Sequence, residues 1–179
     1  MFNPIYLESE RLILKPLGLI HLSYDYVDWM NDPFVYEYLE SGGDYTIDLL
    51  RDYLTQVEKS NILFWAIHLK FDNKHIGNIK IDPINYKHSF GEYGIMMGDR
   101  SEWGKGYAFE ASLTVLNHCF EILNLRKVCL GVISHNEIAI ALYKKLGFII
   151  EGIYKKHLLY NKDFSDCIRM SKFNPNIIL

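Results

Sequence analysis

The segment Trp103–Ala108, which reads Trp-Gly-Lys-Gly-Tyr-Ala, has the composition of a phosphate-binding turn. It follows a strand-like run, Tyr93–Met97, and it opens a helical run, Tyr107–Leu123. The N-terminus of a helix carries unpaired N–H groups and a partial positive charge, so it can bind a phosphate. Glycine lets the backbone approach such an anion closely. Many strand-to-helix turns contain glycine, so a second signal is needed.

That second signal is the motif Asn136–Phe148, which follows about thirty residues later. Asn136, Ile140 and Tyr143 are spaced i, i+4 and i+7, so they share one face of the predicted helix. The side chain of Tyr143 is the one on this face that can exchange a proton. A phenol has an ordinary pKa near 10 and a thiol near 8.5, so a proton can pass between them at low cost.

Strands and helices that could position these motifs run through the whole chain. Apolar and β-branched runs predict strands at Arg11–Pro16, Phe64–Leu69, His75–Ile81, Phe90–Met97, Lys127–Ile133, Ile149–Tyr160 and Phe164–Lys172. Apolar residues at helical spacing predict helices at Asp25–Asn31, Ile47–Ser60 and Tyr107–Leu123, and a further helix that ends at Gly147. The apolar composition of Phe90–Met97 predicts burial on both of its faces. The mixture predicts an α/β fold with a mixed sheet.

Local signals refine the last two helices. One stripe of the first is predicted to face the core, and its members are Ala108, Ala111, Val115, Cys119 and Ile122. Ser134 followed three residues later by Glu137 matches a capping box, which predicts Ser134 as the N-cap of the second. Gly147 suits a left-handed C-cap.

Composition excludes several classes of protein. The chain has 179 residues, which predicts one domain over residues 1–179. The formal net charge of −3 comes without a basic block, so we expect no nucleic-acid partner. The three cysteines are widely spaced, which predicts buried free thiols in a reducing compartment. The opening Met1–Glu8 lacks a basic region followed by an apolar stretch, and no long apolar run follows, so we expect a cytoplasmic protein with no membrane partner.

Together the two motifs resemble those of the GCN5-related N-acetyltransferase (GNAT) family, especially its RimJ/RimL-like branch. Trp103–Ala108 aligns with the family's phosphate loop, although Trp103 stands where the family has Arg or Gln. The family's second motif is matched by Asn136, Ala139, Leu142, Tyr143, Lys145, Gly147 and Phe148. The opening Leu7–Leu14 also resembles the start of that branch.

The resemblance implies acetyl-CoA as co-substrate, no metal, and a mostly antiparallel sheet flanked by helices, with the co-substrate beside the strand before the loop. It implies Tyr143 as the acid that protonates the departing thiolate. The residues implied in co-substrate binding are Ile95, Met96, Met97, Trp103, Gly104, Lys105, Gly106, Tyr107, Ala108, Asn136, Ile140, Tyr143 and Lys145. Lys105 is equally consistent with a solvated loop lysine.

An acceptor amine must lose a proton before or during its attack. For an alkyl amine of pKa about 10.4 this costs roughly 4–5 kcal/mol at pH 7. Glu92, at the start of the strand that leads to the loop, is the candidate base, directly or through water, and relatives use an acidic residue there. His88 and Asp82 are the reserves.

The acceptor is the least determined part of this interpretation. Abundant aromatic residues in the early helices favour a small amine such as an amino-sugar, free or nucleotide-linked. Acetylation of protein N-termini or of polyamines is the alternative, and a homodimer is allowed. A dinucleotide-binding enzyme is disfavoured because Phe109 replaces the third glycine of its fingerprint. A non-catalytic acyl-CoA-binding module is the alternative from another class.

Overall fold

The computed structural model describes residues 5–60 and 62–177. In chain order its elements are β1 (Leu7–Glu8), β2 (Leu12–Pro16), α1 (Tyr24–Asn31), α2 (Pro33–Tyr36), α3 (Ile47–Lys59), β3 (Leu63–Leu69), β4 (His75–Asn85), β5 (Phe90–Met97), α4 (Tyr107–Asn117), β6 (Lys127–Ile133), α5 (Glu137–Lys145), β7 (Ile149–Tyr160) and β8 (Asp163–Phe173). Three shorter helical turns lie at Leu19–His21, Arg100–Glu102 and His118–Ile122. Every strand and helix predicted above is present, with bounds that equal the predicted ones or differ from them by a few residues.

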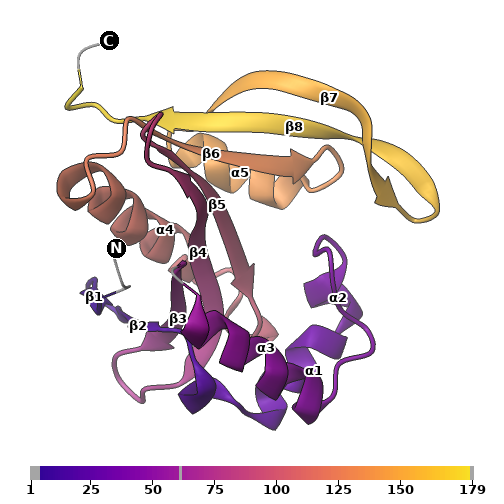
Figure 1. Cartoon of the computed structure of the whole chain (residues 1–179). Coiled ribbons are helices and arrows are strands. Elements are labelled where there is room, and N and C mark those ends of the chain that lie inside the picture. Colours follow the sequence, from indigo (N-terminus) through magenta and orange to yellow (C-terminus); the bar gives the residue numbers. More distant parts are fainter. Residues whose placement is uncertain (1–4, 61, 178–179) are drawn as a thin grey trace. The chain divides into compact units, whose positions relative to one another are not determined.

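The strands pair in the order β1-β2-β3-β4-β5-β6-β8-β7 (Figure 1). β5 and β6 pair in parallel, whereas β1–β2, β2–β3, β3–β4, β6–β8 and β7–β8 pair antiparallel. The predicted mixed α/β fold, with a mostly antiparallel sheet, is therefore confirmed. The chain forms two compact units, one from residues up to Asp82 together with Gly94–Thr114, the other from Pro83–Tyr93 together with residues from Val115 onward.

The first unit is built on the β2–β3–β4 meander. Every residue of β3 is buried, and β3 pairs with β2 through Leu14 and Ile67. α3 buries Leu50, Leu54 and Val57, which are spaced i, i+4 and i+7 and so form a single apolar stripe. This packing gives the unit the core that holds the segment from Gly94 to the start of α4.

A cluster of three histidines lies inside the first unit. The ring centroids of His21, His68 and His75 are 5.0–5.3 Å apart. Burial lowers the pKa of His21 to about 4 and that of His75 to about 3. Since charging three neighbouring rings inside a core is costly, the cluster is neutral at pH 7.

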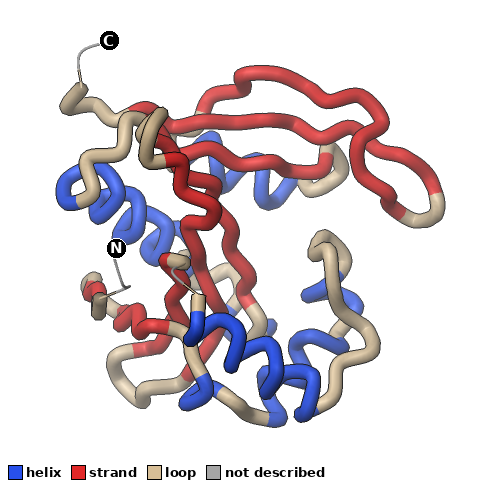
Figure 2. The backbone as a smooth tube through the Cα atoms, in the orientation of Figure 1, coloured by secondary structure: helices blue, strands red, loops and turns tan. Residues whose placement is uncertain are grey.

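The second unit is a β6–β8–β7 sheet with α5 against one face (Figure 2). Tyr143 of α5 packs edge-on against Tyr93, with ring centroids 5.8 Å apart. At the C-terminal end of α5, close to Tyr143 in sequence, the ammonium of Lys172 donates to the carbonyl of Leu146 at 2.7 Å. Because successive strand residues face opposite sides, the neighbours of Tyr93 and Lys172 in sequence, Glu92 and Ser171, face away from α5.

The helix after the glycine turn departs from the predicted stripe. α4 ends at Asn117 and continues as a π-helical turn, His118–Ile122. The wider turn rotates the following residues, so Phe120 is buried and Ile122 is 66% exposed. The prediction that Ile122 faces the core was wrong, whereas Ala111, Val115 and Cys119 are fully buried as expected.

Strand β5 is also less buried than its composition predicted. Only Gly91 and Tyr93 are buried, and the rest of the strand is half-buried. The parallel pairing with β6 covers only Phe90 to Glu92, so the strand runs on beyond it. The prediction of burial on both faces was therefore wrong for most of β5.

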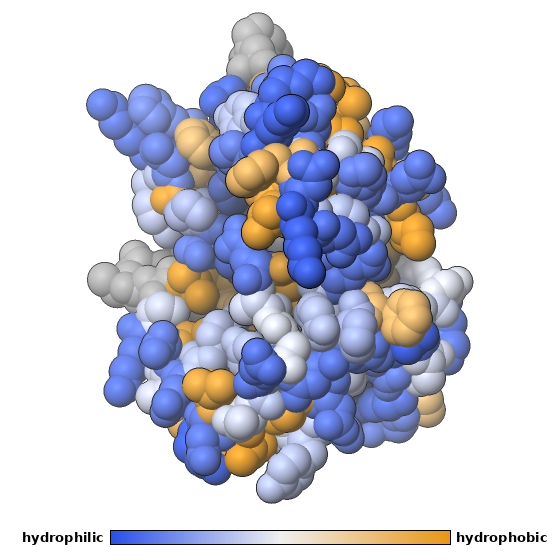
Figure 3. All heavy atoms as spheres, turned by 90° about the vertical axis from the view of Figure 1, so that its right-hand side faces the viewer, coloured by the Kyte–Doolittle hydropathy of each residue, from blue (hydrophilic) through white to orange (hydrophobic). Residues whose placement is uncertain are grey.

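Other expectations concern the surface and the cysteines. All three cysteines are free and buried, as predicted. No helix in the described part of the chain is both long and apolar enough to cross a membrane. In Figure 3, apolar side chains on the visible face occur singly or in small groups among hydrophilic ones.

Candidate functional site

The glycine turn has the backbone conformation of an anion cradle. Gly104 and Gly106 both adopt positive φ angles, +77° and +85°, which side-chain-bearing residues rarely tolerate. A Cβ at Gly104 would have no atom within 4 Å, so the backbone there is open. α4 begins at Tyr107, directly after Gly106, and the first N–H groups of this helix lack helical partners. The turn is therefore suited to bind a phosphate through backbone N–H groups.

Trp103 ties this turn to the end of β5. Its indole N–H donates to the carbonyl of Met97 at 2.9 Å, and the ring is 42% exposed. The guanidinium of Arg100 lies 5.8 Å from the Trp103 ring and 4.0 Å from the Phe34 ring. Trp103 therefore fixes the loop by packing and one hydrogen bond, where the family consensus has a cation or an amide. Ile95 and Met96, which precede Met97, are half-buried.

Lys105 and Arg11 lie at the glycines of the turn, and both are ion-paired. The ammonium of Lys105 lies 2.8 Å from a carboxylate oxygen of Glu102. Arg11 of the N-terminal segment donates to Glu110 at 2.7 Å and to the carbonyl of Lys105 at 3.0 Å. Arg11 also lies 4.6 Å from the centre of the Tyr107 ring. Arg11 thus links the glycine-containing loop to the N-terminal turn of helix α4.

The sequence patterns did not single out Arg11 and Glu110, which pair beside the turn. Their partnership spans 99 residues of sequence, which periodicity cannot reveal. A signal was present, because Arg11 lies within the Leu7–Leu14 segment that carries the resemblance. Glu110 follows the glycine turn directly and is the acid of the helix's first turn.

In the second unit, α5 begins two residues later than predicted. Asn136 is the N-cap, and its side-chain oxygen accepts from the N–H of Ala139 at 3.0 Å. Ser134 is not the N-cap. Its N–H donates to the carbonyl of Asp166, so Ser134 still takes part in the hydrogen bonding between the β6 and β8 segments. At the other end Gly147 has a φ of +90°, as its predicted role requires.

The face of α5 proposed for the co-substrate is half-buried near the N-terminus of the helix and buried near its C-terminus. Asn136 and Ile140 are half-buried and Tyr143 is 8% exposed, whereas Lys145 lies outside on the exposed surface. The Asn136 oxygen accepts the capping hydrogen bond, and the amide NH₂ of the same side chain is its donor for a further partner. Burial raises the pKa of the Tyr143 phenol to about 12. Tyr143 therefore keeps its proton at any physiological pH.

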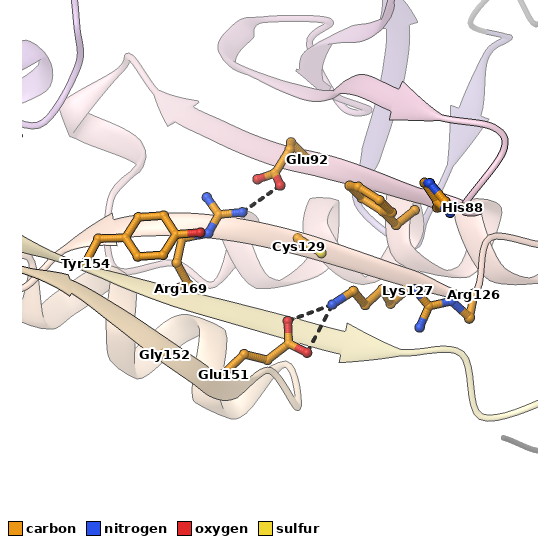
Figure 4. Close-up of a pocket in the computed structure, with 10 residues that line it drawn as sticks. His88, Glu92, Arg126, Lys127, Cys129, Glu151, Gly152, Tyr154 and Arg169 are labelled. Carbon is orange, nitrogen blue, oxygen red and sulfur yellow. Dashed lines mark hydrogen bonds and ion pairs between the residues drawn. The ribbon is translucent and has the colours of Figure 1, made fainter. Parts of the chain in front are cut away.

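Glu92 lies on the face of the second unit's sheet that is turned away from α5. Its Oε1 atom accepts from Nη2 of Arg169 at 2.6 Å (Figure 4). Both side chains are 27% exposed. Beside this pair the ammonium of Lys127 lies 2.8 Å from Glu151. Arg169 was not among the predicted site residues, because β6 separates it from Glu92 and no local pattern links them.

These pairs line a hollow of about 510 Å³ on that face. Its lining residues are His88, Phe90, Glu92, Arg126, Lys127, Cys129, Glu151, Gly152, Tyr154 and Arg169. His88, one of the two reserve bases, lines the same hollow as Glu92, whereas Asp82 belongs to the first unit. Among the described residues, no group of three or more His, Cys, Asp or Glu side chains is arranged to hold a metal ion.

Comparisons with known proteins bear on both motifs. The family profile described as "Acetyltransferase (GNAT) domain" matches residues 11–149. The spermidine N(1)-acetyltransferase of Escherichia coli K12 is 34% identical over 102 residues, which is 57% of this chain and 54% of that protein. The chain thus spans about half the length of the curated relatives it matches first.

Solved structures match over nearly the whole chain. A crystal structure of spermidine N-acetyltransferase from Vibrio cholerae, in complex with CoA and spermine, is 25% identical with a TM-score of 0.82. The match covers 93% of this chain and 97% of that one. The ribosomal-protein-S5-alanine acetyltransferase of Vibrio fischeri is 22% identical with a TM-score of 0.79, over 98% and 100% of the two chains. That second likeness shows the fold alone.

Proposed function

The chain belongs to the acetyltransferase (GNAT) domain family, and on that premise we propose that it transfers the acetyl group of acetyl-CoA to a primary amine. The observation that carries the proposal is the turn at Gly104 and Gly106, with positive φ at both glycines directly before α4. Such a turn binds the phosphates of a ligand by backbone N–H groups. Membership of the RimJ/RimL-like branch stays a prediction.

The residues of the turn and of two further elements would hold the co-substrate. The N–H groups from Gly104 to Ala108 would bind the pyrophosphate, and the backbone of Ile95–Met97 would pair with the amides of the pantetheine arm. Asn136, Ile140 and Lys145 of α5 complete the assignment. Acetyl-CoA supplies an activated acetyl thioester. With the donor already activated, the protein's task is to orient the amine and manage two protons.

Tyr143 is assigned to the leaving sulfur. With the phenol pKa at about 12, full proton transfer to a thiolate of ordinary pKa near 8.5 is uphill by about 5 kcal/mol. For an unburied phenol the figure is about 2 kcal/mol, so burial of this phenol favours a hydrogen bond to the sulfur over early transfer of the proton. We therefore assign Tyr143 a hydrogen bond to the developing negative charge, with proton transfer completed late.

Glu92 is assigned to the acceptor amine. Glu92 and Tyr93 are adjacent on β5 and face opposite sides, and Tyr93 contacts Tyr143. The candidate base and acid of the second unit thus act from opposite faces of one strand. In direct transfer the amine attacks the same carbonyl carbon that the thiolate leaves, so both groups must reach that carbon at the part of β5 beyond Glu92, where the pairing with β6 has ended.

The acceptor we propose is a polyamine. Residues 24–52, which form α1, α2 and the start of α3, carry eight acidic side chains and one basic one, a local net charge of −7. Most of these acids are exposed, including Asp25, Asp28 and Asp44. A polycationic amine is attracted to such a surface. The spermidine acetyltransferases among the relatives agree with this choice.

The structure weakens the case for an amino-sugar. That preference rested on aromatic side chains of the early helices as walls of a pocket. Tyr26 and Trp29 are 2% and 9% exposed and belong to the core. Tyr24 and Phe34 remain exposed, but Phe34 lies under the guanidinium of Arg100. We therefore rank amino-sugars and protein N-termini as the alternatives.

The test is a steady-state comparison of spermidine, glucosamine and an N-terminal peptide as acceptors at low and high ionic strength. We expect the largest kcat/KM for spermidine, and we expect its KM to rise with salt because exposed charges are screened. The KM of a singly charged amine should change less. A preference for glucosamine that is insensitive to salt would contradict the polyamine assignment while leaving acetyl transfer intact.

A further inference from the structure

The ion pair between Glu92 and Arg169 reaches across an intervening strand. Glu92 lies on β5 opposite Cys129 of β6, and Arg169 lies on β8 opposite Gly131 of β6. Neighbouring strands are about 4.8 Å apart, so β5 and β8 are separated by roughly 9.5 Å. Nη2 of Arg169 is nevertheless 2.6 Å from Oε1 of Glu92. The arginine must therefore lie over β6 to reach its partner.

Gly131 leaves the path for this side chain. A Cβ at position 131 would lie 2.9 Å from Nη1 and 3.9 Å from Cδ of Arg169. The first distance is shorter than real Cβ contacts, so a side chain there would shift the guanidinium at the end of the flexible arginine, and it would also press on Sγ of Cys167, 3.1 Å away. Gly131 thus leaves room for the guanidinium in the position from which it pairs with Glu92.

Arg169 has a second glycine beside it, and a side chain at that position would not meet the arginine. Gly152 of β7 lies opposite Arg169 on the other side of β8. A Cβ at Gly152 would meet nothing within 4 Å. The two glycines are therefore a matched pair, one with Arg169 packed over it and one without.

We propose that Arg169 is a positioning residue for Glu92, and that Gly131 allows it to be one. The proposal rests on the proposed function, in which Glu92 faces the acceptor amine. Arg169 takes Oε1 and so fixes the carboxylate, which leaves Oε2 to receive the amine or a bridging water. A guanidinium donates hydrogen bonds and does not accept them, so it cannot compete with Glu92 for the amine's proton.

A purely structural ion pair is the competing explanation, and it predicts a different result. Both side chains are only 27% exposed, so removing one partner leaves a partly desolvated charge and lowers stability. A purely structural role therefore predicts a lower free energy of unfolding, with an unchanged kcat in the protein that remains folded. A large effect confined to kcat would then come from the orientation of Glu92.

The experiment is a double-mutant cycle on Arg169→Gln and Glu92→Gln, with kcat, KM for spermidine and the acetyl-CoA Kd measured for each protein. We expect Arg169→Gln to lower kcat by roughly 10-fold, as misplacement of a catalytic group does, with an unchanged Kd. In the Glu92→Gln background the same substitution should have no further effect on kcat, because its only target is gone. Equal losses in both backgrounds would overturn the proposal, as would full kcat in Arg169→Gln.

Gly131 gives a second test that keeps both charges. We expect Gly131→Ala to lower kcat in the same direction as Arg169→Gln. In the Arg169→Gln background the same alanine should have no further effect, because the guanidinium it displaces is gone. Full kcat in Gly131→Ala would overturn the role given to Gly131. If the wild-type protein transfers no acetyl group to any amine, the proposed function fails and takes this inference with it. Wild-type turnover with an unaffected Arg169→Gln variant overturns the inference alone.

Discussion

Replacing Tyr143 by phenylalanine removes one hydroxyl and little else. The Tyr143 ring packs against Tyr93 and Phe148 with centroid distances of 5.8 and 5.9 Å, and a phenylalanine ring keeps both contacts. The variant should therefore fold and bind acetyl-CoA as the wild type does. What it loses is the donor assigned to the leaving sulfur.

The size of the loss follows from the burial of this phenol. A pKa of about 12 makes complete proton transfer to a thiolate unfavourable by about 5 kcal/mol, so the hydrogen bond itself should carry most of the effect. Hydrogen bonds to charged groups contribute about 1.5–3 kcal/mol, which corresponds to roughly 10- to 150-fold in rate. If proton transfer carried most of the effect instead, the loss would reach the upper part of the roughly 10²- to 10⁴-fold range typical of general acids.

The assay is single-turnover acetyl transfer, which reports the chemical step, together with calorimetry for the acetyl-CoA Kd. Tyr93→Phe is the control, because it removes a hydroxyl from the same aromatic cluster, and its rate should fall by less than about threefold. With a pKa of about 12 the Tyr143 phenol stays protonated at pH 10, so the wild-type rate should show no loss of this donor up to that pH. A Tyr143→Phe variant with the full wild-type rate would show that this tyrosine only packs.

Three further predictions concern the turn and the core. Gly106→Val should weaken acetyl-CoA binding by at least about 10-fold in calorimetry, because φ at Gly106 is +85° and a β-branched residue disfavours it; an unchanged Kd in a folded variant would place the co-substrate elsewhere. Glu110→Gln should raise the same Kd by weakening the Arg11 link, and an unaltered Kd would argue that the turn holds its shape alone. Burial lowers the pKa of His21 to about 4 and that of His75 to about 3, so below pH 6.5 the unfolded chain binds protons that the folded one does not. The free energy of unfolding, measured with urea, should therefore be lower at pH 5 than at pH 7.5 by about 2 kcal/mol for each of these two histidines. Equal free energies of unfolding at the two pH values would refute the low pKa values of His21 and His75.

The sequence was sufficient wherever a local signal determined the structure. Gly147 was predicted as a left-handed C-cap and has the positive φ that this requires. Gly104 and Gly106 were predicted in a turn directly before a helix, and they lie in one. The strand β6 has the predicted bounds because a short apolar run between polar segments leaves little choice. These features depend on a few neighbouring residues and on backbone sterics.

It failed where two local signals competed. Ser134 and Asn136 are both good N-caps, and the choice was made by strand pairing, because Ser134 still bonds to Asp166. Ile122 fits a regular helical stripe, but the π-helical turn shifts the face that follows it. Neither outcome can be read from the residues alone.

The site was predictable in its motifs but not in its charge pairs. The Arg11–Glu110 and Arg169–Glu92 pairs join residues 99 and 77 positions apart. Each depends on strand order and register, which are properties of the whole sheet. The steric role of Gly131 is of the same kind, because it exists only once Arg169 lies across β6.

The central claim is direct transfer of an acetyl group from acetyl-CoA to an amine. The most direct test follows free thiol and acetylated spermidine in one reaction, by colorimetry and mass spectrometry, and examines the protein itself for an acetyl adduct. The account predicts one acetylated amine for each thiol released and no adduct on the protein. Thiol release without acetylated amine, an acetylated protein intermediate, or acetyl-CoA binding with no turnover of any amine would contradict it.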